Sequence, residues 1–134
     1  MQTSSAPDDR TPVIIGVGEA SERIDAADYA ALSPADLAAA AARVALADTG
    51  APGPLQDAID VVAAIRQFEV SGPGFNAPFG CSNNFPRSVA QRIGARPARA
   101  VWEKVGGQGP QHLVNEFAHA IAAGEAGMVL LVGS

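Results

Sequence analysis

Cysteine is nearly absent from this sequence. The one cysteine, Cys81, cannot form a disulfide within the chain, and a single thiol cannot build a cysteine-based metal cluster. Cys81 lies beside glycine, serine and two asparagines, with no cationic neighbour in sequence to activate it. A catalytic thiol also needs a histidine within hydrogen-bond reach. The sequence therefore favours a free cysteine over a nucleophile.

Positive charge and long apolar runs are also scarce. Nine Lys and Arg stand against 14 Asp and Glu, which gives a net charge of −5 and disfavours nucleic acid and anionic membrane surfaces as partners. No apolar run approaches the roughly 20 residues that span a bilayer. The polar start MQTSSAPDDR lacks the layout of a secretory signal. We expect a cytoplasmic protein whose residues 1–10 form a flexible tail.

The remaining sequence has the composition of a folded domain. Its 134 residues are 48% hydrophobic, enough for one globular core over residues 11–134. Strands alternate with helices, so we predict an α/β fold with parallel pairing. The predicted elements are a buried strand at 13–17, a helix at 34–48 capped by Ser33, a strand at 59–65, a long loop at 67–85, a short helix from Asn84 to Ile93 that stops at Gly94, and a partly exposed strand at 99–105.

Residues 101–134 hold the most informative pattern, a strand, a glycine turn, a helix and a second buried strand. The turn is Gly106-Gly107-Gln108-Gly109, Pro110 opens the helix, Gly124 closes it, and the last strand covers 128–132. Glycines permit positive φ and a close backbone approach. Free backbone N–H groups at such a turn favour a negatively charged or polarised oxygen.

Two further patterns carry weaker hypotheses. His112 and His119 are seven residues apart on one helix, roughly 10 Å by helical rise, so they cannot share a metal ion and we predict no metal site. His112 is the better candidate for binding because it lies in the first turn beside the glycines. Gly16-Val17-Gly18 partly matches a dinucleotide fingerprint, but its third glycine is missing and no helix opens there. A Rossmann-like nucleotide binder is thus a weak alternative.

Taken together, the residues from Thr11 onward resemble the amino-terminal part of a thiolase-superfamily protein. The similarity is to the thiolase-like, acetyl-CoA acetyltransferase-like branch related to sterol carrier protein thiolases. It is carried by TPVIIGVGEA, by the block 97–105 leading into GGQGPQHLVNEFAHAI, and by AAGEAGMVLLVGS. The resemblance implies αβαβα layers and a mostly parallel sheet. The chain would be a partial N-terminal thiolase-like domain (11–134) that holds about four strands.

The chain departs from the family pattern at its reactive position. Thiolases place a nucleophilic cysteine at the turn before the buried helix, and Gly106 occupies the matching position here. The resemblance puts a histidine and a second cysteine in a carboxy-terminal half that these residues do not include. We therefore expect a fragment, a cleaved product or one chain of a split protein. The resemblance also places residues 99–104, with Trp102, at a subunit interface of a homodimer or larger oligomer.

The resemblance implies a coenzyme A thioester as substrate or ligand, with no permanently bound cofactor. The expected binding residues are Gly106, Gly107, Gln108, Gly109 and His112. The leading hypothesis is part of a thiolase-like acyltransferase of lipid metabolism, active as a full-length protein rather than as this segment alone. One alternative is a non-catalytic acyl-CoA-binding or scaffold subunit. Another is a retro-aldol carbon–carbon lyase that works with a partner chain supplying the missing half.

Overall fold

The computed structural model describes residues 8–134, so most of the predicted tail at 1–10 lies outside the described residues. Asp8, Asp9 and Arg10 are exposed and belong to no helix or strand. The elements within the described part are α1 (Pro34–Asp48), η1 (Leu55–Ala58), β1 (Val61–Ile65), η2 (Phe68–Val70), α2 (Phe85–Ile93), β2 (Arg99–Glu103), α3 (Gly109–Ala122) and β3 (Val129–Val132).

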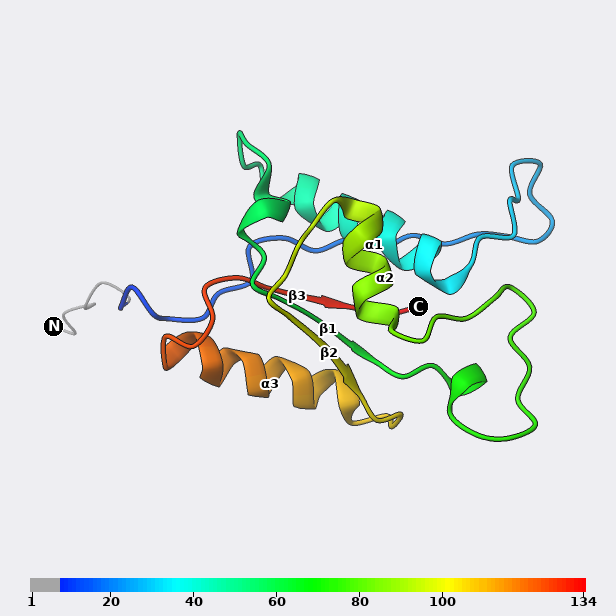
Figure 1. The fold of residues 1–134 in the computed structure, drawn as a ribbon. Coiled ribbons are helices and arrows are strands. Elements are labelled where there is room, and N and C mark those ends of the chain that lie inside the picture. Colours follow the sequence, from blue (N-terminus) through cyan, green and yellow to red (C-terminus); the bar gives the residue numbers. More distant parts are fainter. Residues whose placement is uncertain (1–7) are drawn as a thin grey trace, which may run out of the picture.

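The three strands form one parallel sheet in the order β2-β1-β3. Val61 of β1 stands opposite Arg99 of β2 and Val129 of β3. Helices α1 and α2 cover one face of the sheet and α3 covers the other (Figure 1). The arrangement confirms the α/β prediction with parallel pairing.

Strand β1 forms the centre of the core because both of its faces are covered. Successive side chains of a strand point to opposite faces. Val62 and Ala64 pack with α1 and α2, whereas Val61 and Ala63 pack with α3. All four are at most 2% exposed. The buried positions of α1 are all alanines, whose small side chains let the helix lie close to its neighbours.

Helix α1 begins where the sequence predicts because local groups satisfy its first turn. The Ser33 hydroxyl accepts from the Asp36 N–H at 3.2 Å and donates to the Asp36 carboxylate at 2.5 Å. Arg92 of α2 donates from Nε to the other carboxylate oxygen at 2.5 Å. The Ser33 hydrogen bond, followed by the Arg92 contact, lowers the pKa of Asp36. These contacts join the start of α1 to α2.

The strand expected at residues 13–17 is absent, and that prediction is wrong. The segment is extended but pairs with no strand, so the sheet has three strands in the described residues rather than about four. Its side chains are exposed, with Ile14 at 82%. Gly16 and Gly18 lie directly on α1, and a Cβ on either would overlap the α1 backbone at Ala45. Contact with α1 therefore replaces pairing with the sheet.

Strand β3 is also less buried than predicted. It pairs with β1 on one side only, and Leu131 remains 37% exposed. The cause is that no strand among residues 8–134 pairs with its outer edge. Strand β2, predicted as an edge or half-exposed strand, does lie at the other edge of the sheet.

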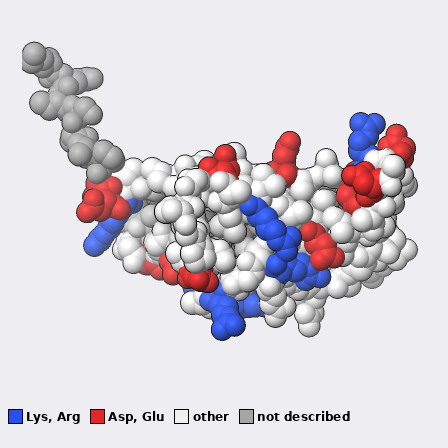
Figure 2. All heavy atoms as spheres, turned by 90° about the horizontal axis from the view of Figure 1, so that it is seen from above, with Lys and Arg blue, Asp and Glu red and all other residues white. Residues whose placement is uncertain are grey.

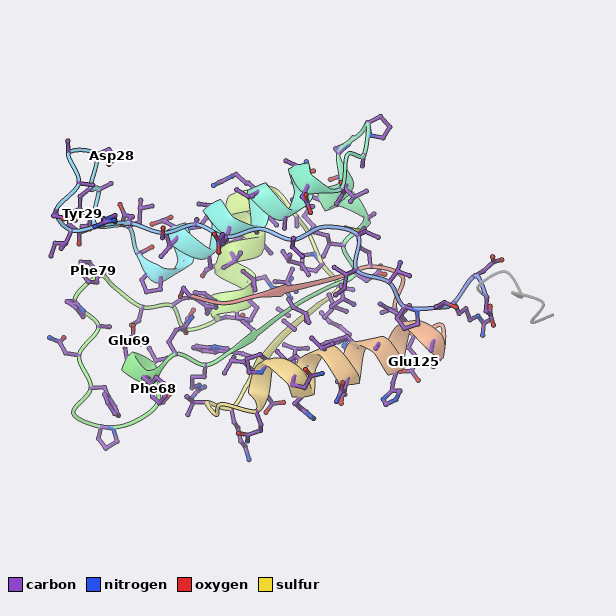
Figure 3. All side chains as sticks on the ribbon, turned by 180° about the vertical axis from the view of Figure 1, so that it is seen from behind. Asp28, Tyr29, Phe68, Glu69, Phe79 and Glu125 are labelled. Atoms are coloured by element: carbon purple, nitrogen blue, oxygen red, sulfur yellow. The ribbon has the colours of Figure 1, made fainter. Side chains whose placement is uncertain are left out.

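Two long irregular segments project from the end of the sheet where the strands finish (Figure 1). Figure 3 shows Asp28 and Tyr29 at the tip of one, and Phe68, Glu69 and Phe79 on the other. Acidic and basic side chains are interspersed on the face in Figure 2, without a broad patch of one sign. Between residues 8 and 134, no helix has the length and apolar character needed to cross a membrane.

Candidate functional site

The glycine turn follows β2 and leads directly into α3. The Gly109 N–H donates to the Gly106 carbonyl at 2.9 Å, and the His112 N–H donates to the Gln108 carbonyl at 3.0 Å. None of the three glycines in the turn has a positive φ, so that part of the prediction is wrong. Gly109 is instead required for close packing, because a Cβ there would lie 2.5 Å from Cδ1 of Ile65.

A cleft of about 510 Å³ lies beside this turn, and we call it the turn cleft. Gly106 and Gly107 form part of its wall. The rest comes from residues 65–69 at and after the end of β1, from Val105, from the start of α3 and from residues 131–134 at the end of β3. The carboxyl ends of parallel strands meet at one edge of a sheet, which is where ligands bind in open α/β folds. The fold therefore brings the turn to a position suited to a ligand.

The turn cleft is mostly apolar with a polar rim. Its apolar lining comes from Ile65, Phe68, Val105, Pro110, Leu113, Val114, Leu131 and Val132. Arg66 is the one basic side chain in the lining, and its guanidinium lies 4.6 Å from the centre of the Trp102 ring. The Trp102 ring thus positions the Arg66 guanidinium near the end of β1 by a cation–π contact. An apolar hollow with a few polar groups is typical of small-molecule sites.

The five predicted binding residues separate into two groups. Gly106 and Gly107 line the turn cleft, whereas Gln108, Gly109 and His112 do not. Gly109 is buried against β1, and the Gln108 amide folds over Gly106. His112 is near Glu103 instead, with Nε2 at 3.6 Å from a carboxylate oxygen of that residue. The binding roles of all five remain predictions.

Cys81 lies in a different cleft of about 560 Å³, between the 67–84 loop and the first turns of α1 and α2. It is exposed and free, as the sequence suggested. Neither histidine lines this cleft, and Gly106 does not reach it. Gln67 lines both clefts, and its Nε2 atom is buried without a hydrogen-bond partner among residues 8–134. The thiol and the glycine turn are thus separate features.

The remaining candidates have structural roles. Phe117 is 3% exposed in the core beneath α3. Trp102 packs against the α1 and α2 side of the sheet and is covered by Arg66. Gly16 and Gly18 pack on α1, and no helix opens after them. Across the described residues, no three His, Cys, Asp or Glu side chains are grouped as metal ligands.

Comparison with solved structures shows which known proteins this chain is related to. The chain is similar to a monomeric SCP2-thiolase-like protein (type 1) from Mycobacterium smegmatis, at 46% identity and a TM-score of 0.74. The match covers 92% of this chain. The chain belongs to the thiolase-like proteins. It spans 23% of the length of that solved protein. No protein-family model matches the sequence, and neither does any curated protein.

The relationship confirms the sequence-based resemblance and the thiolase-like fold. It does not favour the homodimer expected from the sequence, because the solved protein is described as monomeric.

Sequence reasoning missed the polar end of β1. Arg66 and Gln67 directly follow the buried strand, and both line the turn cleft. Polar residues at the carboxyl end of a central parallel strand are a recognisable signal. The signal was available in the run Ile65-Arg66-Gln67, but only the strand order shows that it lies next to the glycine turn.

Proposed function

We propose that the chain is the part of a thiolase-like protein that holds the thioester end of an acyl-CoA in the turn cleft. The observation that carries the proposal is the position of Gly106 and Gly107 in the wall of an apolar cleft at the carboxyl ends of β1 and β3. The acyl-CoA ligand comes from the family resemblance. The apolar lining suits an acyl chain, and the turn suits its polarised carbonyl oxygen.

The backbone of the turn supports an oxygen-binding role. Neither the N–H group of Gly106 nor that of Gly107 donates to another residue between 8 and 134. They precede α3, whose amino end carries a partial positive charge. Preorganised donors aimed at a developing oxyanion supply about 3 kcal/mol of transition-state stabilisation in enzymes that use them. The turn would polarise a thioester carbonyl by hydrogen bonds, without forming a covalent bond to it.

Arg66 supports binding of the anionic part of the ligand. Coenzyme A carries phosphate groups, and a guanidinium is well matched to phosphate oxygens. Arg66 is the basic residue in the cleft lining, and stacking on Trp102 restricts its side chain. A preorganised cation loses less conformational entropy when it binds. Arg66 is therefore the side chain we assign to a phosphate, although it shares the lining with the carboxylate of Glu69.

Titration calorimetry with acetyl-CoA tests the proposal. Gly107→Asp should weaken binding at least tenfold, about 1.4 kcal/mol, because a carboxylate would face the thioester oxygen. A Cβ at position 107 would meet no atom within 4 Å, and the residue has no positive φ, so the fold should accept the change. Gly53→Asp is the matched control, since Gly53 is equally open but lies in a distant turn.

The expected result is binding to the unaltered chain and to Gly53→Asp, with a clear loss in Gly107→Asp. No binding heat with the unaltered chain at millimolar acetyl-CoA would overturn the proposal. Equal affinity in all three proteins would show that the ligand binds outside the turn cleft, which also contradicts it.

A second function, non-covalent binding without acyl transfer, is favoured by the absence of a thiol from the turn. Gly106 has no side chain to attack, and Cys81 lies in the other cleft. Incubation with acetyl-CoA followed by intact mass measurement should show no acetyl adduct on this chain. An adduct on Cys81 that forms only with the thioester would instead support covalent chemistry.

A further inference from the structure

The turn cleft adjoins the cleft that holds Cys81, which we call the Cys81 cleft. The turn cleft has a volume of about 510 Å³ and the Cys81 cleft one of about 560 Å³. Gln67 and Glu69, on the loop that follows β1, line both of them. Figure 3 shows Glu69 and Phe68 on this loop. A ligand too long for the turn cleft would therefore run past Gln67 and Glu69 into the Cys81 cleft.

The two clefts differ in the chemistry of their walls. The turn cleft is mostly apolar, which suits a hydrocarbon chain. The Cys81 cleft is richer in polar side chains, because Ser33, Ser82 and Ser88 line it together with Asn83 and Arg92. A ligand that spans both clefts would thus match them best with an apolar chain followed by a polar group.

The side-chain nitrogen of Gln67 lacks a hydrogen bond at the place where the clefts adjoin. This Nε2 atom is buried, and no group between residues 8 and 134 accepts from it. The backbone of Gln67 is held in place, because its carbonyl accepts from the Val70 N–H at 3.3 Å and from the Ser71 hydroxyl. Buried donors are nearly always paired, since an unpaired one is costly. An acceptor atom of a ligand would satisfy Gln67.

The charges in the Cys81 cleft favour a neutral group over an anion. Among residues 8–134, Arg92 is the one basic side chain in the lining, and it already donates to the Asp36 carboxylate at 2.5 Å and to the Ser88 carbonyl at 3.1 Å. Glu69 adds a carboxylate that has no ion pair in the described chain. It would repel a carboxylate on the ligand. A hydroxyl group both accepts and donates, so it suits Gln67 and Glu69 together.

We infer that the ligand is an acyl thioester whose chain carries a hydroxyl group remote from the thioester. The thioester lies at the glycine turn and the apolar chain fills the turn cleft. The hydroxyl reaches the Cys81 cleft, where it accepts from Nε2 of Gln67 and donates to the carboxylate of Glu69. Gln67 thereby selects a hydroxylated chain over a plain one. This inference rests on the function proposed for the turn cleft and names the substrate class of that site.

Titration calorimetry with the intact 134-residue chain tests the selection. The ligands are acyl-CoA thioesters from hexanoyl to dodecanoyl, each ending in a methyl, a hydroxyl or a carboxylate group. At the length that reaches Gln67, the hydroxyl should strengthen binding about tenfold, because it satisfies a buried donor. Gln67→Leu should remove this gain and leave the affinity for the plain thioester unchanged. Gln56→Leu is the matched control, because Gln56 is also half-buried but lines neither cleft.

Two further readouts separate a binding role of Gln67 from a structural one. Leucine replaces the unpaired amide with an apolar group of similar size, so Gln67→Leu should be at least as stable as the unaltered chain in urea denaturation. A marked loss of stability would instead assign Gln67 to the fold and overturn the inference. The second readout is alkylation of the Cys81 thiol by iodoacetamide. The hydroxylated thioester should slow it about tenfold at saturation, whereas acetyl-CoA is too short to do so.

Three other results would overturn the inference. Equal affinity of the hydroxylated and plain thioesters at every length would mean that water satisfies Gln67. Tighter binding of the terminal carboxylate than of the hydroxyl would make Arg92 the recognising group. Alkylation of Cys81 that is not slowed at saturation would place the chain outside the Cys81 cleft. The function proposed for the turn cleft would survive each of these results, because it depends on acetyl-CoA binding and on its loss in Gly107→Asp.

Discussion

Segment 13–17 and strand β1 have almost the same kind of sequence and opposite environments. The first reads VIIGV and the second VVAAI. Val62 of β1 is fully buried between two neighbouring strands and two layers of helices, whereas Ile14 is 82% exposed on the surface. Residue preference for strands is similar in the two runs. The difference lies in what each run can pair with.

The comparison shows that a strand needs partners on its edges as well as a suitable sequence. β1 is paired on both sides by β2 and β3. Segment 13–17 meets the backbone of α1 through two glycines, and no strand among residues 8–134 pairs with it. Propensity for strand structure depends strongly on such context. Segment 13–17 is thus the place where the sequence pattern and the structure disagree.

The largest expected effect on stability comes from placing a charged residue in each of the two runs and comparing the losses. Val62→Asp should abolish folding or cost more than about 4 kcal/mol, because an unpaired carboxylate would be buried. Ile14→Asp should change stability by about 0.5 kcal/mol or less, since that side chain already meets solvent. Urea denaturation followed by circular dichroism measures both. Comparable losses in the two variants would show that segment 13–17 is buried and would break the comparison.

A smaller effect should follow from disturbing the contact between segment 13–17 and α1. Gly18→Val would force a side chain into the α1 backbone at Ala41 and Ala45, and overpacking of this kind costs about 1–3 kcal/mol. Amide hydrogen exchange should become faster at residues 13–17 and stay unchanged in β1. Gly53→Val, at an open position, serves as the control. Unchanged exchange at 13–17 would mean that α1 does not hold the segment.

The smallest expected effect concerns the pH dependence of α1, the helix that contacts both runs. The pKa of Asp36 is lowered from its usual 3.8, first by the Ser33 hydrogen bond and then by Arg92. A lowered pKa in the folded state gives stability that is present above the usual pKa and is lost as pH falls through the folded value. The side chain is 43% exposed, so the gain should stay under about 1 kcal/mol.

Asp36→Asn should therefore flatten the acid side of the stability curve, below the usual pKa of 3.8, and leave its slope near neutral pH unchanged. Thermal unfolding at a series of pH values measures the difference between the two proteins. An equal loss of stability at acid pH in both proteins would show that Asp36 is not the group that causes the loss.

The helices could be predicted well because their signals are local. Helix α1 has the predicted bounds, with Ser33 as its cap, and α2 begins after Asn84 and ends at Gly94 in a left-handed conformation. Such caps act within one turn of the helix. The strand at 13–17 could not be judged in this way, because its pairing depends on residues far away in sequence.

The candidate site could be predicted only in part, because some of its features are local in sequence and others depend on the tertiary structure. The glycine turn after β2 is visible in the sequence and lies where expected, at the start of α3. Sequence could not show that His112 faces Glu103 rather than the cleft, because that depends on how α3 is rotated on the sheet. It also could not show that Arg66 and the turn share one cleft, since that follows from the strand order.

The most direct test of the account is a backbone amide NMR titration of the chain with acetyl-CoA and, separately, with coenzyme A. We predict chemical-shift changes specific to acetyl-CoA at Gly106 and Gly107, together with changes at Arg66 that both ligands cause. Acetyl-CoA shifts that are confined to residues around Cys81, or absent from the glycine turn at saturation, would contradict a thioester site in the turn cleft.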